Sequence, residues 1–157
     1  MDSMIACVGH VQFECSQAPM NPTKRGLILL VEDNPDDELM TLRSFRESHV
    51  DLDVVVVRDG AEALDYLFGT GAYEGRDLSS MPSRIMLDLY LPKVSGLEVL
   101  QRIKSDQRTK SIPVTMLTGS DYEMITNETL RQGADACVVK PVTCEGVRQI
   151  AARSSPA

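Results

Sequence analysis

The chain has 157 residues, of which 43% are hydrophobic and 25% are charged, and its formal net charge at pH 7 is −7. This length and composition are typical of one globular domain with a full hydrophobic core. The negative charge argues against binding to the phosphate backbone of nucleic acids, which calls for a basic face. No apolar run approaches the roughly 18 residues of a membrane span, so we expect no membrane partner either.

Residues 1–25 show no steady period and are rich in Met, Ser, Gln and Pro. They lack the basic start and the long apolar core of a secretory signal. The four cysteines show no CxxC spacing, which is typical of inert thiols in a reducing compartment. We therefore expect an irregular amino-terminal extension and a cytoplasmic protein. The cysteines are Cys7, Cys15, Cys137 and Cys144.

A short and nearly continuous apolar run at residues 27–32 predicts a strand that is covered on both faces. Asn34 is a suitable N-cap for the helix that follows, with Pro35 at its first position. Three apolar residues at a spacing of three predict the buried side of this helix. Three acidic residues are interpreted as a solvated first turn that favours the helix start. The apolar residues are Leu39, Leu42 and Phe45, and the acidic residues are Asp36, Asp37 and Glu38.

The next part of the chain continues the alternation of strand and helix. Residues 52–57 predict a second strand, and Asp59-Gly60 leads into a second helix. Residues 69–83 carry no period and form a loop longer than the 2–6 residues that are usual between such elements. The apolar face of the second helix consists of Leu64, Leu67 and Phe68.

Three further strands are predicted at residues 84–88, 112–118 and 136–139, and a helix follows each of them. Capping boxes, in which a Ser side chain and a Glu three residues later satisfy the first amides, predict where two of these helices start. The capping boxes are Ser95 with Glu98 and Ser120 with Glu123, and the inward faces are Leu97, Leu100 and Ile103 in the third helix and Val147, Ile150 and Ala151 in the last.

A strand followed by a helix, repeated five times, predicts a doubly wound α/β domain with a parallel sheet and helices on both faces. In such sheets the functional site lies outside the carboxyl ends of the strands. Four of the predicted strands end in polar groups of different kinds, which we expect to converge at that edge. These groups are the acids Glu32 and Asp33, the acid Asp88, the hydroxyl of Thr118 and the amine of Lys140.

Three carboxylates at one edge repel one another unless a cation relieves them. Mg²⁺ prefers one or two carboxylates together with waters and phosphate oxygens. The ammonium group of Lys140 can hold a phosphate, and the hydroxyl of Thr118 can donate a hydrogen bond to a phosphoryl oxygen. Asp88 can then act as a nucleophile that forms an aspartyl phosphate, with catalysis by positioning and charge neutralisation.

With these motifs, residues 27–152 resemble the receiver domain of bacterial two-component response regulators. The motif set comprises an acid pair after the first strand, Asp with Leu-Pro and Gly after the third, Thr after the fourth and Lys-Pro after the fifth. The spacing agrees as well, with 30 residues from Asp88 to Thr118 and 22 from Thr118 to Lys140. The VEDNPDD opening and the 69–83 loop are similar to single-domain receivers that partner phytochrome-type sensor kinases.

The resemblance implies a flavodoxin-like sheet of order 2-1-3-4-5 and a switch that receives a phosphoryl group from a histidine kinase with Mg²⁺ or Mn²⁺. It implies a cis peptide bond at Lys140-Pro141. The domain organisation that we expect is an extension at 1–25, a receiver domain at 26–153 and a tail at 154–157. The implied roles are Asp88 as phosphoacceptor, Thr118 and Lys140 as phosphoryl contacts, and Glu32, Asp33, Asp88 and the backbone carbonyl of Tyr90 as metal ligands.

Two positions bear on how the switch works in this chain. The position three residues before the lysine is usually aromatic and rotates inward on activation, but here it is Cys137. A cysteine has no aromatic ring that could move between an outward and an inward position. We therefore hypothesise that output relies more on dimerisation or on direct contact with a partner. The sequence leaves open whether a homodimer forms. We further hypothesise that the bulk of Tyr90 slows hydrolysis of the acyl phosphate.

We expect this signalling switch to act by protein–protein contact rather than as an enzyme. Two other functions are alternatives to it. A phosphatase of the haloacid-dehalogenase type also attacks with an Asp on a parallel sheet, but it carries a second acid where Tyr90 stands here. An FMN carrier of the same sheet order requires a hydroxyl-rich phosphate loop after the first strand, where this chain has EDNPDD.

Overall fold

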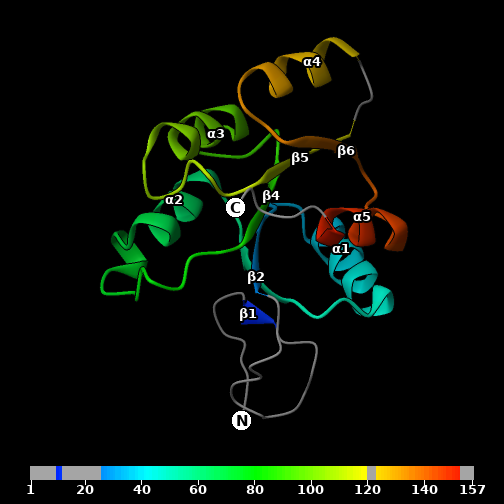
Figure 1. The fold of residues 1–157 in the computed structure, drawn as a ribbon, viewed down its shortest axis with the longest axis horizontal. Coiled ribbons are helices and arrows are strands. Elements are labelled where there is room, and N and C mark those ends of the chain that lie inside the picture. The colour runs from blue at the N-terminus through cyan, green and yellow to red at the C-terminus, as the bar shows by residue number, and fades with distance from the viewer. Residues whose placement is uncertain (1–9, 12–25, 120–122, 153–157) are drawn as a thin grey trace.

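The computed structural model describes residues 10–11, 26–119 and 123–152, which form a central sheet with helices on both faces (Figure 1). Strand and helix alternate along the chain from Leu27 onward, as predicted. The strands are β1 (His10–Val11), β2 (Leu27–Val31), β3 (Asp53–Val57), β4 (Arg84–Asp88), β5 (Val114–Thr118) and β6 (Ala136–Val139). The helices are α1 (Pro35–Ser48), α2 (Gly60–Phe68), the short 3₁₀ helix η1 (Gly71–Tyr73), α3 (Gly96–Ser105), α4 (Glu123–Arg131) and α5 (Cys144–Ala152).

The sheet has the strand order β1-β3-β2-β4-β5-β6. The five strands from β2 to β6 are parallel, and numbered by themselves they follow the predicted order 2-1-3-4-5. β1 adds two residues antiparallel to the edge of β3. This arrangement puts β2 in the middle, between β3 and β4, so the acids after β2 lie beside the end of β4.

Two hydrophobic cores fill the space between the sheet and its helices. Alternate residues of β2 face opposite layers, with Leu29 and Val31 in one core and Ile28 and Leu30 in the other. The first core packs against α2 and α3, and the second packs against α1 and α5. Since both faces of the strands are covered, the continuous apolar runs of the sequence are explained.

Helix α1 follows the predicted burial pattern only in part. Leu39 is 65% exposed, so its predicted place on the buried side is wrong, whereas Phe45 is 1% exposed as predicted. The buried side consists of Thr41, Phe45 and Ser48, whose spacing of four and three residues matches the helical period. Two of these are hydroxyl residues, and the Ser48 hydroxyl donates to the carbonyl of Phe45 (2.8 Å). Leu42 is partly buried and packs against the same core as Phe45, so the apolar pattern is wrong at Leu39 and misses the two hydroxyl residues.

The helix starts agree better with the sequence. Asn34 caps α1 by accepting hydrogen bonds from the backbone N–H groups of Asp36 (2.8 Å) and Asp37 (3.1 Å). Ser95 accepts from the N–H of Glu98 (3.3 Å) at the start of α3. The predicted capping box at Ser120 lies outside the described residues.

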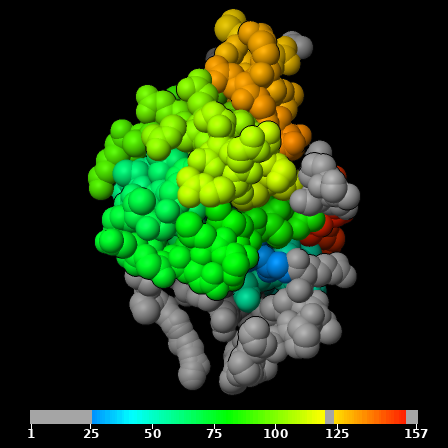
Figure 2. All heavy atoms as spheres, turned by 60° about the vertical axis from the view of Figure 1, so that its left-hand side comes forward, coloured from blue at the N-terminus to red at the C-terminus, as the bar shows by residue number. Residues whose placement is uncertain are grey.

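The face formed by α2 and α3 is continuous, and α4 projects from the body of the domain beside it (Figure 2). None of the helices in the described parts of the chain has the length and apolar character that crossing a membrane requires. The two cysteines that the structure describes, Cys137 and Cys144, are free thiols.

Candidate functional site

The acids after β2 and at the end of β4 meet at the carboxyl edge of the sheet. One carboxylate oxygen from each of Glu32, Asp33 and Asp88 can be chosen so that all lie within 4.8 Å of one another. Glu32 is fully buried, Asp88 is 5% exposed, and Asp33 faces solvent. Three carboxylates with one open side fit a hard divalent cation that keeps part of its water shell.

Lys140 reaches this cluster from the end of β6. Its Nζ donates to Asp88 Oδ2 (3.2 Å), Glu32 Oε2 (3.2 Å) and Asp37 Oδ2 (2.8 Å). The peptide bond between Lys140 and Pro141 is cis, as predicted. The amine thus lies against the carboxylate that the sequence singled out as nucleophile.

The electrostatics of the site follow from this crowding. Burial, the hydrogen bond with Asp88 and the negative charge of Asp88 together raise the pKa of Glu32 to about 7. Burial lowers the pKa of Lys140, but the hydrogen bond to Asp37 and the charges of Asp88 and Glu32 outweigh it and hold that pKa above its ordinary value. The amine therefore stays charged, while burial and the neighbouring Asp88 favour the protonated form of Glu32.

Backbone N–H groups contact two of the three acids. Glu32 Oε1 accepts from the N–H of Asn34 (3.2 Å), and Asp88 Oδ1 accepts from the N–H of Tyr90 (3.4 Å). Gly96 lets the start of α3 pack directly on the end of β4, because a Cβ there would collide with the carbonyl oxygens of Asp88 and Leu89. This contact explains the glycine that follows the Leu-Pro turn in the sequence.

The remaining predicted residues lie around the same edge. Thr118 ends β5, is 1% exposed, and accepts the backbone N–H of Lys140 at its carbonyl (2.7 Å). Tyr90 is 70% exposed and lines an apolar groove of about 360 Å³ next to Met124 of α4. Cys137 lies in β6, where it pairs with Met116 and is half-buried.

Asp37 is the site residue that the sequence interpretation missed. It was assigned to a solvated helix face, but it is only part-exposed and binds Lys140 more closely than Glu32 or Asp88 does. That assignment is wrong for Asp37, because the first turn of α1 lies beside the end of β6. A pattern of local charges carries no signal for a contact between residues 103 positions apart.

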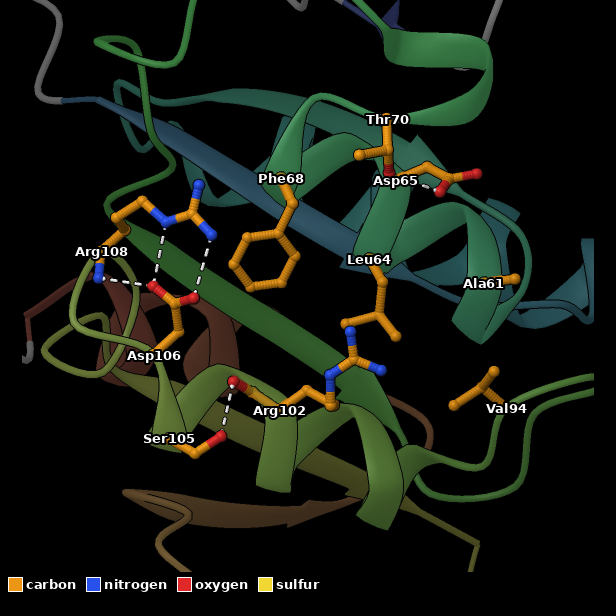
Figure 3. Close-up of a pocket in the computed structure, with 10 residues that line it drawn as sticks. All are labelled: Ala61, Leu64, Asp65, Phe68, Thr70, Val94, Arg102, Ser105, Asp106 and Arg108. Atoms are coloured by element: carbon orange, nitrogen blue, oxygen red, sulfur yellow. Dashed lines mark hydrogen bonds and ion pairs between the residues drawn. The ribbon is translucent and has the colours of Figure 1, made fainter.

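A groove separate from this site lies between α2 on one side and α3 with the segment that follows it on the other (Figure 3). It measures about 460 Å³ and contains an ion pair rather than a cluster of like charges. Arg108 donates to both carboxylate oxygens of Asp106 (3.0 and 2.9 Å), and its guanidinium lies over the ring of Phe68, 4.8 Å from the centroid. Since Arg108 neutralises the carboxylate of Asp106, this groove does not call for a metal ion there.

Taken together, a parallel sheet of order 2-1-3-4-5 with acids, a hydroxyl and an amine at its carboxyl edge defines a phosphoacceptor switch domain. A family model described as the response regulator receiver domain matches residues 28–152. The chain therefore belongs to the response regulator receiver domain family, whose members are phosphorylated on an aspartate in two-component signalling.

Similar proteins include other response regulators. The chain is 42% identical over 103 residues to the response regulator Rcp1 of Synechocystis sp., covering 66% of this chain and 67% of the relative. A structure of the Mn²⁺-bound form of Rcp1 has a TM-score of 0.70 at 30% identity, covering 84% of this chain and 99% of that one.

Two further solved structures are similar. The bacteriophytochrome response regulator RtBRR is 45% identical with a TM-score of 0.74, covering 81% of this chain and 76% of the other. The phosphorylated cyanobacterial phytochrome response regulator RcpA is 38% identical with a TM-score of 0.67, and the match covers 80% of this chain and 87% of RcpA.

Proposed function

We propose that Asp88 is the residue that accepts the phosphoryl group, which a sensor histidine kinase donates from its phosphohistidine. A carboxylate oxygen of Asp88 attacks phosphorus, and the bond from phosphorus to the histidine nitrogen breaks as the new P–O bond forms. The observation that carries this proposal is the position of the Lys140 amine, 3.2 Å from Asp88 Oδ2 at the open edge of the acid cluster.

The other side chains of the edge supply positioning and charge. Lys140 carries the positive charge that a developing phosphoryl oxygen needs, and Thr118 adds a hydroxyl donor at the end of the neighbouring strand. Little covalent chemistry is left for the protein in phosphoryl transfer, so a correctly aimed ammonium and hydroxyl are sufficient contributions.

We propose that Glu32, Asp33 and Asp88 hold Mg²⁺ or Mn²⁺, together with the backbone carbonyl of Tyr90. When bound, the cation neutralises the carboxylates and the phosphoryl oxygens. The grouping of one carboxylate oxygen from each of the three acids within 4.8 Å supports this assignment, since it concentrates negative charge where a cation can bind. The Mn²⁺-bound form of the relative Rcp1 supports it as well.

We infer that the partner is a phytochrome-like sensor kinase and that the protein works in the cytoplasm, where such kinases draw on ATP. The support comes from relatives named as bacteriophytochrome and phytochrome response regulators. We propose that output is by protein–protein contact, with residues 26–153 as the signalling unit and a homodimer as one form of that contact.

The exposed Tyr90 beside Asp88 supports the hypothesis that it slows loss of the phosphoryl group, and a Tyr90→Ala variant with an unchanged rate of loss would count against it.

The test is exposure of the protein to a small acyl phosphate with and without Mg²⁺, followed by intact mass measurement. We expect one added phosphoryl group that requires Mg²⁺ and that Asp88→Asn abolishes. Asp106→Asn is the matched control, because it removes a carboxylate from the groove of Figure 3. Uptake that survives Asp88→Asn would overturn the proposal, and turnover of a generic phosphomonoester would favour the phosphatase alternative.

A further inference from the structure

Lys140 is held from two sides. Glu32 and Asp88 approach its amine from the ends of β2 and β4, and Asp37 approaches from the first turn of α1. The Asp37 contact is the shortest of the three at 2.8 Å. Asp37 is not part of the carboxylate cluster that could hold a metal ion.

An ammonium group has three N–H donors and no more. In this structure three carboxylates accept from Lys140, so its donors are fully used. A phosphoryl group on Asp88 requires one of these donors, and a cation among the acids competes with the amine for Glu32. Asp37 is then the one acceptor of the three that neither event removes.

The backbone of Asp37 is itself fixed. Its N–H donates to the side chain of Asn34 (3.1 Å), which caps α1, and Pro35 occupies the first position of the helix. A carboxylate on a capped helix turn therefore reaches the amine without a flexible loop between them. Its neighbour Asp36 shares the same cap and the same turn but is exposed.

We propose that Asp37 is a positioning residue for phosphoryl transfer: it anchors the Lys140 amine at the position where the phosphoryl oxygens arrive. This inference rests on the proposed function of Asp88. Without Asp37 the amine stays charged and close to the acids, but it loses the anchor that persists once Glu32 and Asp88 have other partners. The expected cost is in the rate of phosphoryl uptake rather than in metal binding.

The test compares Asp37→Asn with Asp36→Asn, which removes the same charge from the same turn without a contact to Lys140 among the described residues. We expect Asp37→Asn to lower the rate of phosphoryl uptake from a small acyl phosphate at saturating Mg²⁺ about tenfold below Asp36→Asn, as for loss of one charge-assisted hydrogen bond that is partly exposed. We expect the Mg²⁺ affinities of the two variants to agree. Asp37→Glu retains a carboxylate within reach of the amine, so its rate should fall between those of Asp37→Asn and the wild type.

A readout on the amine itself separates positioning from a general structural effect. In ¹⁵N spectra of the Mg²⁺-loaded protein, the Lys140 ammonium signal of a held amine should persist in Asp36→Asn and broaden in Asp37→Asn. Equal uptake rates in the two Asn variants would overturn the positioning role, and so would a loss of Mg²⁺ affinity confined to Asp37→Asn. Absence of uptake by the wild type at Asp88 would instead overturn the proposed function from which the inference starts.

Discussion

Two clusters in this domain each combine a basic side chain with carboxylates, but they shift the pKa of a carboxyl group in opposite directions. In the groove between α2 and the segment after α3, one guanidinium meets one carboxylate, and Arg108 lowers the pKa of Asp106 to about 2 through its hydrogen bonds. At the carboxyl edge of the sheet, one amine faces the carboxylates of Glu32, Asp37 and Asp88, and the pKa of Glu32 is raised to about 7.

The difference lies in charge balance and burial. The Arg108–Asp106 pair is exposed, complete and screened by water, which makes it a surface feature of small energetic weight. The Lys140 cluster is largely buried and has more negative than positive groups, so its charges are satisfied only when another cation arrives. An excess of like charge that folding does not neutralise therefore marks the functional site here.

The largest expected effect comes from removing the single amine. Lys140→Gln should lower phosphoryl uptake from a small acyl phosphate by about a hundredfold, as for loss of one preorganised donor to a developing negative charge. Arg108→Gln, the same kind of change in the other cluster, should leave uptake unchanged. Intact mass measurements over time give both rates, and equal rates would remove the distinction between the clusters.

Mg²⁺ should stabilise the protein through the carboxylates of the Lys140 cluster and not through the Arg108–Asp106 pair. At a Mg²⁺ concentration about a hundred times the dissociation constant, the wild type should gain about 2.7 kcal/mol in free energy of unfolding. Asp33→Asn should lose most of this gain at the same Mg²⁺ concentration, and Asp106→Asn should keep it. Denaturant unfolding with Mg²⁺ and with a chelator checks this, and a gain that survives Asp33→Asn would contradict the assigned ligand.

Without metal, the site should be a source of instability. Asp88→Asn removes one of the like charges around Glu32 and should raise the free energy of unfolding of the metal-free protein by about 1 kcal/mol. Asp106→Asn should not raise it, since it removes an attractive partner. Denaturant unfolding in chelator compares the two variants, and a destabilised Asp88→Asn would show that Asp88 relieves charge rather than adding to it.

The smallest expected effect concerns the Arg108–Asp106 pair. The pKa of Asp106 is lowered from 3.8 to about 2, so any stability from the pair is present above pH 4 and is lost as the pH falls through about 2. Arg108→Gln should return the pKa of Asp106 toward its ordinary value. A titration of the Asp106 carboxyl carbon by NMR measures this directly, and an unchanged low pKa would mean that Arg108 is not its cause.

The sequence predicted the parallel sheet and the convergence of polar groups well, because both follow from short-range patterns and topology. The end of β4 at Asp88 and the whole of β6 lie where the apolar runs place them. The cap by Asn34 was also predictable, since an N-cap acts on amides two and three residues away.

The misses concern packing between distant segments. Leu39 was placed inside because it is apolar, whereas Thr41 and Ser48 occupy the buried side of α1 and Leu39 faces solvent. Asp37 was placed in solvent, although the neighbouring end of β6 brings Lys140 to it. Neither the exact width of a helix's buried side nor an ion pair across the fold can be derived from the residues of one helix alone.

The phosphoryl group should reside on a single carboxylate of the Lys140 cluster, that of Asp88. Borohydride reduces an aspartyl phosphate to homoserine, so reduction after treatment with an acyl phosphate, followed by peptide mass mapping, identifies the modified residue. We predict homoserine at position 88 in the presence of Mg²⁺ and none in its absence. Homoserine at another position, or at position 88 without any divalent cation, would contradict the account.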